Sequence, residues 1–570
     1  MLSVCHLKIN AMPTLQFKGK NIIWNHHLAV PFHTLDEVPE LHYQPEKANG
    51  NMIIEGDNLI ALKALLPQFA GRIKCIYIDP PYNTGNDNGI GKGWIYNDNV
   101  NSPLIKDWIG KEVGFDDLTK HDKWLCMISP RIKLLKDLLQ VGGVIFISIN
   151  ELELHNLKAI MDEIFGEENF VEIFSWTKTY TPPGLSPKSR QTNEYILCYE
   201  NQKTTEKYKG ELLDNGDQPL LNRGNQRRVL VFPKDKVFLK LPDGKYESGE
   251  FERVKLIKSI NVKNGKSDVD IELEAEFKWT DTTLENEIKS GTTFIIKSEK
   301  FSIRFIRPDE EGYKAPTNLI KEKMLSPNIN KTKDNVGSNE NASSELEELL
   351  GSNSFPYPKP VSLIKFLTKL CTKNSDIILD SFSGSGTTMH AVMELNKEDR
   401  GNRKCIMVQM PENSEAEPDK NICKDITRER VKRAIDKYGY DSGFKYYRLG
   451  IPLDAETMLA GQLPTYTQFA KYVYYLCTGE NLEVEEKINE ADFYVGDYGK
   501  QAIYLVYKQD YETLTRLALN LTLAEKIKQQ QPGKKRIVYA PSCFLDEEYL
   551  TDNQIEYVGI PYNLFQRKYE

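Results

Sequence analysis

The chain has 570 residues, 40% of them hydrophobic and 27% charged, a composition typical of a globular protein with several buried cores. Its 74 basic and 82 acidic residues give a net charge of -8, which excludes a polycation that binds nucleic acid through bulk charge alone. Twelve basic and 18 acidic residues lie in 451–570, so most of the net charge belongs to that segment. Any basic surface must therefore be local.

The cysteines and the hydropathy pattern place the chain in a reducing, aqueous compartment. The nine cysteines are scattered, with no Cys-x-x-Cys and no histidine pair at metal-ligand spacing, so we expect reduced thiols and no metal site. No run of about 18 apolar residues occurs, and the N-terminus lacks the pattern of a signal peptide. We expect a cytoplasmic protein without a membrane span.

The first predicted elements follow an irregular N-terminal arm, 1–50. Asp57 or Asn58 is a suitable N-cap for a helix that begins near Leu59. Apolar runs then predict strands at 75–78, 144–149, 171–176 and 194–199, with helices at 118–139 and 152–165. Strands separated by helices of this length predict a parallel α/β sheet in 51–200.

The alternation of strands and helices stops after residue 200 and resumes at residue 354. Residues 201–353 alternate charge with short β-like runs and include a linker rich in Asn, Lys and Ser, so they are expected to form an inserted domain of largely β character. Segment 354–445 predicts helices at 363–370 and 387–395 and strands at 377–380 and 405–409. Segment 446–570 predicts a separate α/β domain, with strands at 502–507, 536–539 and 555–558 and a helix near 513–528. The fold class is thus a doubly wound, mostly parallel sheet whose two halves flank the insert.

A glycine turn joins the strand at 377–380 to the next helix. Asp380 ends that strand, and Gly384 and Gly386 precede a helix that starts at Thr387. In a doubly wound sheet, such a turn lets the backbone approach a nucleotide-like ligand at the carboxyl ends of the strands. The third glycine of the dinucleotide fingerprint is replaced by Met389, which favours a nucleoside ligand without pyrophosphate. The alternative is a tight strand-to-helix connection without a ligand.

The sequence Asp79-Pro80-Pro81-Tyr82 ends the strand at 75–78. The amino nitrogen of a nucleobase is a poor nucleophile, because its lone pair is delocalised into the ring. The Asp79 carboxylate and the Pro80 carbonyl would accept its two N–H bonds and favour the pyramidal form, while the Tyr82 ring would stack on a base taken out of the duplex. The alternative is a Pro-Pro turn with a buried tyrosine.

These motifs together resemble those of amino-methylating DNA methyltransferases. The match comprises Asp79-Pro80-Pro81-Tyr82, Phe355-Pro356-Tyr357-Pro358-Lys359-Pro360 and Asp380-Ser381-Phe382-Ser383-Gly384-Ser385-Gly386-Thr387. Their order, with the catalytic half first, resembles that of the permuted β-group adenine enzymes. The phrases Gly56-Asp57-Asn58-Leu59, Tyr82-Asn83-Thr84-Gly85, Trp124-Leu125 and Asp162-Glu163-Ile164-Phe165-Gly166 resemble the Mod subunits of type III restriction-modification systems in particular.

The resemblance implies transfer of a methyl group from S-adenosylmethionine to N6 of a flipped adenine in a specific duplex DNA sequence. Asp79, Pro80, Pro81 and Tyr82 would form the catalytic site. The cofactor would be held by Lys359, Asp380, Phe382, Gly384, Gly386 and Thr387. Where such folds often carry an acidic residue for the ribose hydroxyls, this chain has Gln409, with Glu412 three residues later, and the sequence leaves open which of them acts.

Basic residues outside these motifs suggest how DNA would be contacted. In 177–193, between two core strands, Lys178, Tyr180, Lys188 and Arg190 predict a DNA-contacting loop, with an ordinary surface loop as the alternative. Residues 201–300 hold 19 basic and 18 acidic residues, so single arginines there are interpreted as solvated. The charges of Arg428, Arg430, Lys432 and Arg433 are likewise interpreted as a solvated helix face opposite Ile426 and Val431.

Other functions remain alternatives to adenine methylation. They are a catalytically silent DNA-binding specificity subunit, a cytosine-N4 methyltransferase, and a methyltransferase for RNA or a protein amide. An aspartate at position 79 favours adenine, because the cytosine-N4 enzymes usually carry serine at that position. The resemblance further implies a homodimer and a restriction subunit of the Res type as a partner. Because the catalytic and recognition segments are close to neutral, we expect DNA binding with only moderate salt dependence.

Overall fold

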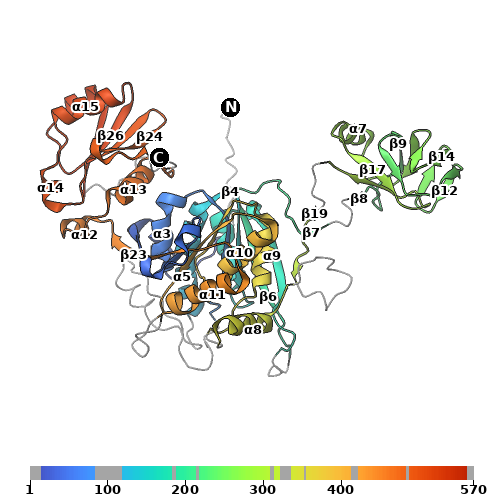
Figure 1. The fold of residues 1–570 in the computed structure, drawn as a ribbon, viewed down its shortest axis with the longest axis horizontal. Helices are drawn as coiled ribbons and strands as arrows, with labels where there is room; N and C mark the ends of the chain where they lie inside the picture. The colour runs from blue at the N-terminus through green and yellow to red at the C-terminus, as the bar shows by residue number, and fades with distance from the viewer. Residues whose placement is uncertain are drawn as a thin grey trace, which may run out of the picture. The chain divides into compact units, whose positions relative to one another are not determined.

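The computed structural model describes residues 14–83, 119–182, 188–212, 217–308, 313–320, 336–351, 355–412, 421–482 and 487–561. Thr84 and Gly85 of one matched phrase lie outside these ranges. The chain divides into two compact units, which are described separately (Figure 1). The first contains residues 1–205, 318–322 and 334–570, and the second contains 206–317 and 323–333.

The first unit is built on a ten-stranded sheet in the order β1-β23-β2-β22-β21-β3-β4-β6-β5-β20. Its strands are β1 (His33–Glu37), β2 (Met52–Glu55), β3 (Ile73–Ile78), β4 (Leu139–Ile149), β5 (Phe170–Thr177), β6 (Asn193–Asn201), β20 (Leu319–Ile320), β21 (Ile377–Asp380), β22 (Lys404–Gln409) and β23 (Lys445–Pro452). The strands from β23 through β4 run parallel, whereas β1 and β6 are antiparallel to their neighbours. The prediction of a doubly wound, mostly parallel sheet is confirmed.

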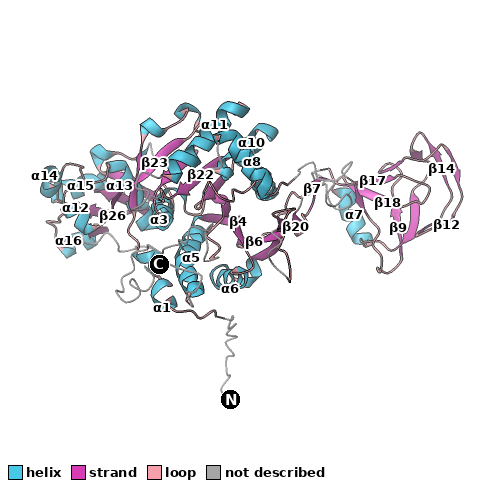
Figure 2. Cartoon of the chain, turned by 90° about the horizontal axis from the view of Figure 1, so that it is seen from below, coloured by secondary structure: helices cyan, strands magenta, loops and turns pink. Residues whose placement is uncertain are grey.

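Helices cover both faces of this sheet. They are α1 (Lys20–Ile23), α2 (His26–Ala29), α3 (Asn58–Phe69), α5 (Lys120–Leu138), α6 (Leu154–Phe165), α8 (Asn339–Leu350), α9 (Val361–Cys371), α10 (Thr387–Asp399) and α11 (Glu429–Tyr438). On one side α3 packs against α5 and α5 against α6, while α10 packs against α9 and α11 on the other. Figure 2 shows α5 and α6 on one side of β4 and β22, with α8, α10 and α11 on the opposite side. Both faces of the central strands are therefore buried, which explains why their sequences are continuous apolar runs rather than alternating ones.

The two motif-bearing strands, β3 and β21, are neighbours in the sheet. From β3 the chain continues to β4 on one side, and from β21 it continues to β22 on the other side. This point of reversal is where doubly wound sheets bind ligands, outside the carboxyl ends of the strands. Both aspartates, Asp79 and Asp380, stand at that edge, although about 300 residues separate them along the chain.

Three segment boundaries differ from those predicted. The N-terminal arm is not irregular throughout, because β1 pairs with β23 at the edge of the central sheet. The start of the segment predicted to begin at 446 forms most of β23, whose parallel pairing with β2 makes it part of the same sheet. Residues 336–351, expected to belong to the insert and its linker, contain α8, which packs against α11. Sequence composition reports local polarity, whereas these boundaries depend on long-range pairing.

The second unit is largely β, as predicted. Its elements are β7 (Glu211–Leu212), β8 (Gln218–Pro219), β9 (Arg228–Phe232), β10 (Val237–Leu239), β11 (Gly244–Tyr246), β12 (Gly249–Phe251), β13 (Val254–Leu256), β14 (Ile260–Lys263), β15 (Lys266–Ser267), β16 (Ile271–Ala275), α7 (Asp281–Lys289), β17 (Thr293–Ile296), β18 (Ile303–Ile306) and β19 (Tyr313–Lys314). Alternating strands such as β16 place every second residue in an apolar core that includes Phe232, Leu273 and Phe294. The unit thus has a hydrophobic core of its own.

The C-terminal part of the first unit has a four-stranded sheet in the order β24-β25-β26-β27. Its elements are α12 (Ala455–Leu459), α13 (Tyr466–Thr478), β24 (Tyr494–Tyr498), β25 (Gln501–Leu505), α14 (Tyr511–Arg516), α15 (Leu521–Gln530), β26 (Lys535–Ala540), α16 (Glu547–Asp552) and β27 (Ile555–Gly559). The helix expected near 513–528 is two helices, because the Asn520 side chain caps a new helix. Helix α13 packs on α3. Over the described residues, no helix is both long and apolar enough to cross a membrane.

Candidate active site

The segment Asp79-Pro80-Pro81-Tyr82 leaves β3 where the two prolines end the sheet ladder. Its position is fixed from both sides. The indole Nε1 of Trp124 on α5 donates to the Pro81 carbonyl at 2.7 Å, and Asn83 donates to the buried Glu153 carboxylate at 2.5 Å. These contacts hold the Asp79 and Tyr82 side chains at the carboxyl edge of the sheet.

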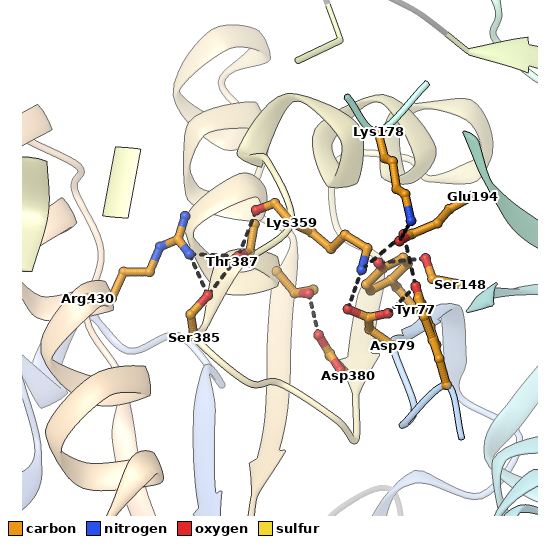
Figure 3. A network of polar contacts seen from close by, with 12 residues as sticks. Tyr77, Asp79, Ser148, Lys178, Glu194, Lys359, Asp380, Ser385, Thr387 and Arg430 are labelled. Carbon is orange, nitrogen blue, oxygen red and sulfur yellow. Dashed lines mark hydrogen bonds and ion pairs between the residues drawn. The ribbon is translucent and has the colours of Figure 1, made fainter. Parts of the chain in front are cut away.

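Asp79 is the centre of a compact polar cluster (Figure 3). The Lys359 ammonium donates to Asp79 Oδ2 at 2.7 Å, and the Tyr82 hydroxyl donates to Asp79 Oδ1 at 2.7 Å. The Lys359 Nζ also lies 5.1 Å from the centre of the Tyr82 ring. Burial alone would lower the pKa of Lys359, but the carboxylates of Asp79 and Glu194 outweigh it and raise the pKa. The lysine predicted to hold the cofactor therefore lies beside Asp79 and Tyr82, the residues predicted to be catalytic.

Glu194 at the start of β6 belongs to the same cluster and was not predicted. It is 6% exposed, and its carboxylate accepts from Lys178 at 3.1 Å and from the Tyr82 hydroxyl at 3.2 Å, with the Lys359 Nζ at 3.5 Å. Burial raises the pKa of Glu194, but the two lysines and Tyr82 together lower it below the ordinary value. The sequence signal was weak, because Glu194 is one of two acidic residues in β6, with Glu200 near its other end.

The second motif builds a turn around Asp380, which is 2% exposed. Its carboxylate accepts from the Phe382 N–H at 3.0 Å and from the Thr388 hydroxyl at the start of α10. Burial raises the pKa of Asp380 to about 7, although both hydrogen bonds act in the opposite direction. This aspartate stabilises the loop from inside.

The glycines of the turn are required by its geometry. Gly384 and Gly386 have φ values of 49° and 82°, in the left-handed region that favours glycine. A Cβ on Gly386 would lie 2.9 Å from the carbonyl oxygen of Thr427, and one on Gly384 would lie 3.0 Å from the Phe355 ring. A side chain at either position would therefore displace the segments that surround the loop.

The loop is tied to the end of β22 through Gln409. The Gly384 N–H donates to Gln409 Oε1 at 2.7 Å, and Gln409 Nε2 donates to Glu412 Oε1 at 2.9 Å. The Gln409 amide is thus used to position the glycine loop, whereas Glu412 is exposed at the carboxyl edge of the sheet.

Arg430 was wrongly interpreted as part of a solvated face. It is fully buried, and its Nη1 donates to the hydroxyls of Ser385 and Thr387, each at 2.7 Å. The preceding turn η6 (Cys423–Arg428) is a π-helix, whose extra residue rotates the following side chains relative to a 3.6-residue pattern. Thr387 also donates to the Lys359 carbonyl at 3.1 Å, so Arg430 supports both the glycine loop and the segment that carries Lys359.

The four residues predicted to contact DNA are differently placed. Lys188 and Arg190 are exposed, Tyr180 is half-buried, and Lys178 forms its ion pair with Glu194. Residues 183–187 of that segment lie outside the described ranges. Among the residues with described positions, no three His, Cys, Asp or Glu side chains gather as a metal site would require, and the absence of a bound metal remains a prediction.

Comparison with known proteins gives consistent matches. A family model described as a DNA methylase matches residues 73–449. The type III restriction-modification enzyme StyLTI Mod subunit of Salmonella typhimurium is 29% identical over 73% of this chain, and the EcoPI Mod subunit of Escherichia phage P1 is 29% identical over 67%. The chain spans 63% and 61% of the lengths of these relatives. The Type II methyltransferase M.KpnI of Klebsiella pneumoniae is 27% identical over 66% of this chain and 84% of its own length.

Among solved structures, the M1.HpyAVI-SAM complex matches 67% of this chain and 98% of that chain. The identity is 14% and the TM-score is 0.29, a score too low to support an inference. The fold assignment therefore rests on the sheet order and on the family match.

Proposed function

The chain belongs to the DNA methylase family, and from this we propose that it transfers a methyl group from S-adenosylmethionine to N6 of a flipped-out adenine in duplex DNA. The observation that carries the proposal is the adjacency of β3 and β21. It brings Asp79 and Tyr82 to the same sheet edge as Asp380 and the glycine loop. A base acceptor and a nucleoside-binding turn thus meet where a doubly wound sheet binds its ligands.

The residues at the end of β21 fit S-adenosylmethionine. The left-handed Gly384 and Gly386 leave backbone without Cβ atoms at this edge, and Asp380, Phe382 and Thr387 shape the turn. We assign the ribose hydroxyls to Glu412 rather than Gln409, because the Gln409 amide already bridges Gly384 and Glu412. When bound, the cofactor supplies a methyl group on a positively charged sulfur, an electrophile with its leaving group attached.

The chain's own contribution is to make N6 of adenine nucleophilic. An Asp79 oxygen and the Pro80 carbonyl accept the two N–H bonds of the amino group, which favours a localised lone pair on nitrogen. The Tyr82 ring supplies a face on which the flipped base stacks. The Asp79 carboxylate also stabilises the positive charge that develops on N6 as the new N–C bond forms.

DNA recognition and assembly extend this proposal. We assign target recognition to the insert, and DNA contacts beside the flipped base to Tyr180, Lys188 and Arg190. We also propose a homodimer and a Res-type restriction subunit as partners, acting in the cytoplasm. The similarity to Mod subunits of type III restriction-modification enzymes supports the restriction subunit. Lys178 is a less suitable phosphate contact than predicted from sequence, because its charge is already paired with Glu194.

The test is expression of the chain in a methylation-deficient bacterium, with modified bases mapped by sequencing. We expect N6-methyladenine confined to one sequence motif, and none with Asp79→Ala. N4-methylcytosine instead would overturn the choice of base, and no motif-specific methylation would support the silent specificity subunit. Equal adenine signal from the wild type and Asp79→Ala would show that the site is elsewhere.

A further inference from the structure

Glu194 makes three contacts that the proposed methyl transfer does not explain. Its carboxylate is buried at the start of β6 and receives Lys178, Lys359 and the Tyr82 hydroxyl. Strand β6 lies beyond β4 in the sheet, so Glu194 reaches the cluster from the side opposite β21 (Figure 3). A buried carboxylate must be paired to offset its lost hydration, but pairing alone does not require partners that it shares with Asp79.

Both groups that occupy Asp79 have Glu194 as a second acceptor. The Lys359 Nζ lies 2.7 Å from Asp79 Oδ2 and 3.5 Å from Glu194 Oε2. The Tyr82 hydroxyl lies 2.7 Å from Asp79 Oδ1 and 3.2 Å from the same Glu194 oxygen. A hydroxyl has one proton, so donation to Glu194 would replace donation to Asp79. At these distances both donors bond more closely to Asp79 than to Glu194. Small shifts of the Lys359 and Tyr82 side chains would reverse this preference.

An occupied Asp79 is a poor acceptor for the adenine amino group. The Lys359 ammonium partly neutralises the carboxylate and would repel the positive charge that develops on N6. Moving that ammonium away from every carboxylate would leave a buried charge unpaired, which is strongly unfavourable. A second carboxylate within reach removes most of this cost.

The charges of the cluster support such an exchange. Two carboxylates, Asp79 and Glu194, face two ammonium groups, those of Lys359 and Lys178. Lys178 approaches Glu194 Oε1, whereas Lys359 and Tyr82 approach Oε2, so the two sides of the carboxylate serve different partners. The cluster remains neutral whichever carboxylate holds Lys359.

We propose that Glu194 is a positioning residue that takes over Lys359 and the Tyr82 hydroxyl when the adenine amino group engages Asp79. The inference rests on the proposed function and deepens it. Glu194 does not touch the reacting atoms. It sets how readily Asp79 is released for the base, and Lys178 competes with Lys359 for Glu194.

Two charge-removing substitutions should therefore have opposite effects. In Glu194→Gln the neutral amide holds Lys359 less well, the lysine stays on Asp79, and the single-turnover rate at saturating DNA should fall about 10-fold or more. In Lys178→Met the cation that remains beside Glu194 among the described residues is Lys359, so the release of Asp79 is favoured and the rate should exceed that of the wild type. In both variants S-adenosylmethionine should bind within about two-fold of the wild-type affinity, because the glycine loop is unchanged.

A double-mutant cycle separates this role from a structural one. In a Lys359→Met background the group to be exchanged is absent, so adding Glu194→Gln should slow transfer less than about two- to three-fold. If Glu194→Gln reduces cofactor binding or lowers the melting temperature, Lys178→Met distinguishes the positioning role from a structural one. Loss of a purely structural ion pair would slow Lys178→Met too, whereas the exchange predicts a faster rate.

The outcomes distinguish this inference from the proposed function. A Lys178→Met rate that does not exceed that of the wild type, or an unchanged rate in Glu194→Gln, would overturn the exchange while wild-type adenine methylation still stands. Absence of methylation by the wild-type chain would instead reject the proposed function.

Discussion

Two aspartates end neighbouring strands of the same sheet and have opposite environments. Asp79 is only partly buried and is held by an ammonium and a phenol hydroxyl, with a second carboxylate beside them. Asp380 is almost fully buried and accepts only neutral donors among its described contacts, a backbone N–H and a threonine hydroxyl. The same residue type at equivalent strand ends thus lies either in a cluster of charged groups or inside a loop, and its partners decide which.

The largest effect that separates the two aspartates is expected from Asp79→Ala. Losing the acceptor for the adenine amino group should reduce the single-turnover methylation rate about 100- to 1000-fold. Cofactor binding should remain near the wild-type level, because the glycine loop is not altered. Single-turnover assays with labelled cofactor, together with calorimetric binding, would measure both quantities. A large loss of cofactor affinity would mean that the two strand ends are not functionally distinct.

For Asp380 the expected effect is on the free energy of unfolding, which should depend on pH. Its folded pKa is raised to about 7, above that of an unfolded aspartate, so the folded state keeps a proton that the unfolded state releases. The stabilisation is present below about pH 4 and is lost as the pH rises to about 7, amounting to about 4 kcal/mol at most.

The comparison variant is Asp380→Asn, which cannot titrate. Thermal unfolding between pH 4 and 8 should show the wild type losing stability relative to this variant as the pH rises. Parallel curves for the two proteins would contradict the raised pKa. Other carboxylates, such as Glu194 with its lowered pKa, act in the opposite direction, but they are common to both proteins and cancel in the difference.

Arg430→Met tests the hydrogen bonds that Arg430 donates to the glycine loop. Ser385 and Thr387 would lose a charged donor, so cofactor affinity should fall about 10-fold, in keeping with about 1.5 kcal/mol for a hydrogen bond to a charged group. Burial lowers the pKa of Arg430 to about 10, so its charge persists at neutral pH. The rate at saturating cofactor should change little. An equal loss in Arg433→Met, which changes a half-exposed arginine on the same helix, would point to a general effect on α11.

The smallest effect is expected at the exposed Arg190. If it meets a phosphate, Arg190→Gln should weaken binding of all DNA sequences alike and reduce the salt slope of log affinity by about one. The control is Lys526→Gln, which removes one charge from a lysine that pairs with Asp492 in the C-terminal part. Titrations at several salt concentrations would measure both variants. An unchanged salt slope for Arg190→Gln would support the alternative that residues 177–193 form an ordinary surface loop.

Local pattern was sufficient for most elements near the site. The apolar run before Asp79 and the run ending in Asp380 predicted β3 and β21, because a strand buried on both faces has a continuous hydrophobic sequence. Pattern failed at Arg430, since a π-helical turn changes the periodicity on which the helical-face argument depends. It also gave no indication that β6 runs antiparallel, because side-chain alternation is the same in either direction.

The sequence by itself determined that each of the two motifs follows a strand, and the order in which the motifs lie along the chain. Two prolines must end a strand, and left-handed turns favour glycine, so local pattern alone places both motifs at strand ends. Only the tertiary structure decided which side chains contact the motifs. Lys359 contacts Asp79, Glu194 lies beside Lys359, and Arg430 donates to Ser385 of the glycine loop. The physical reason is that burial and charge pairing depend on which segments the sheet order brings together, and that information is not contained in any local stretch of sequence.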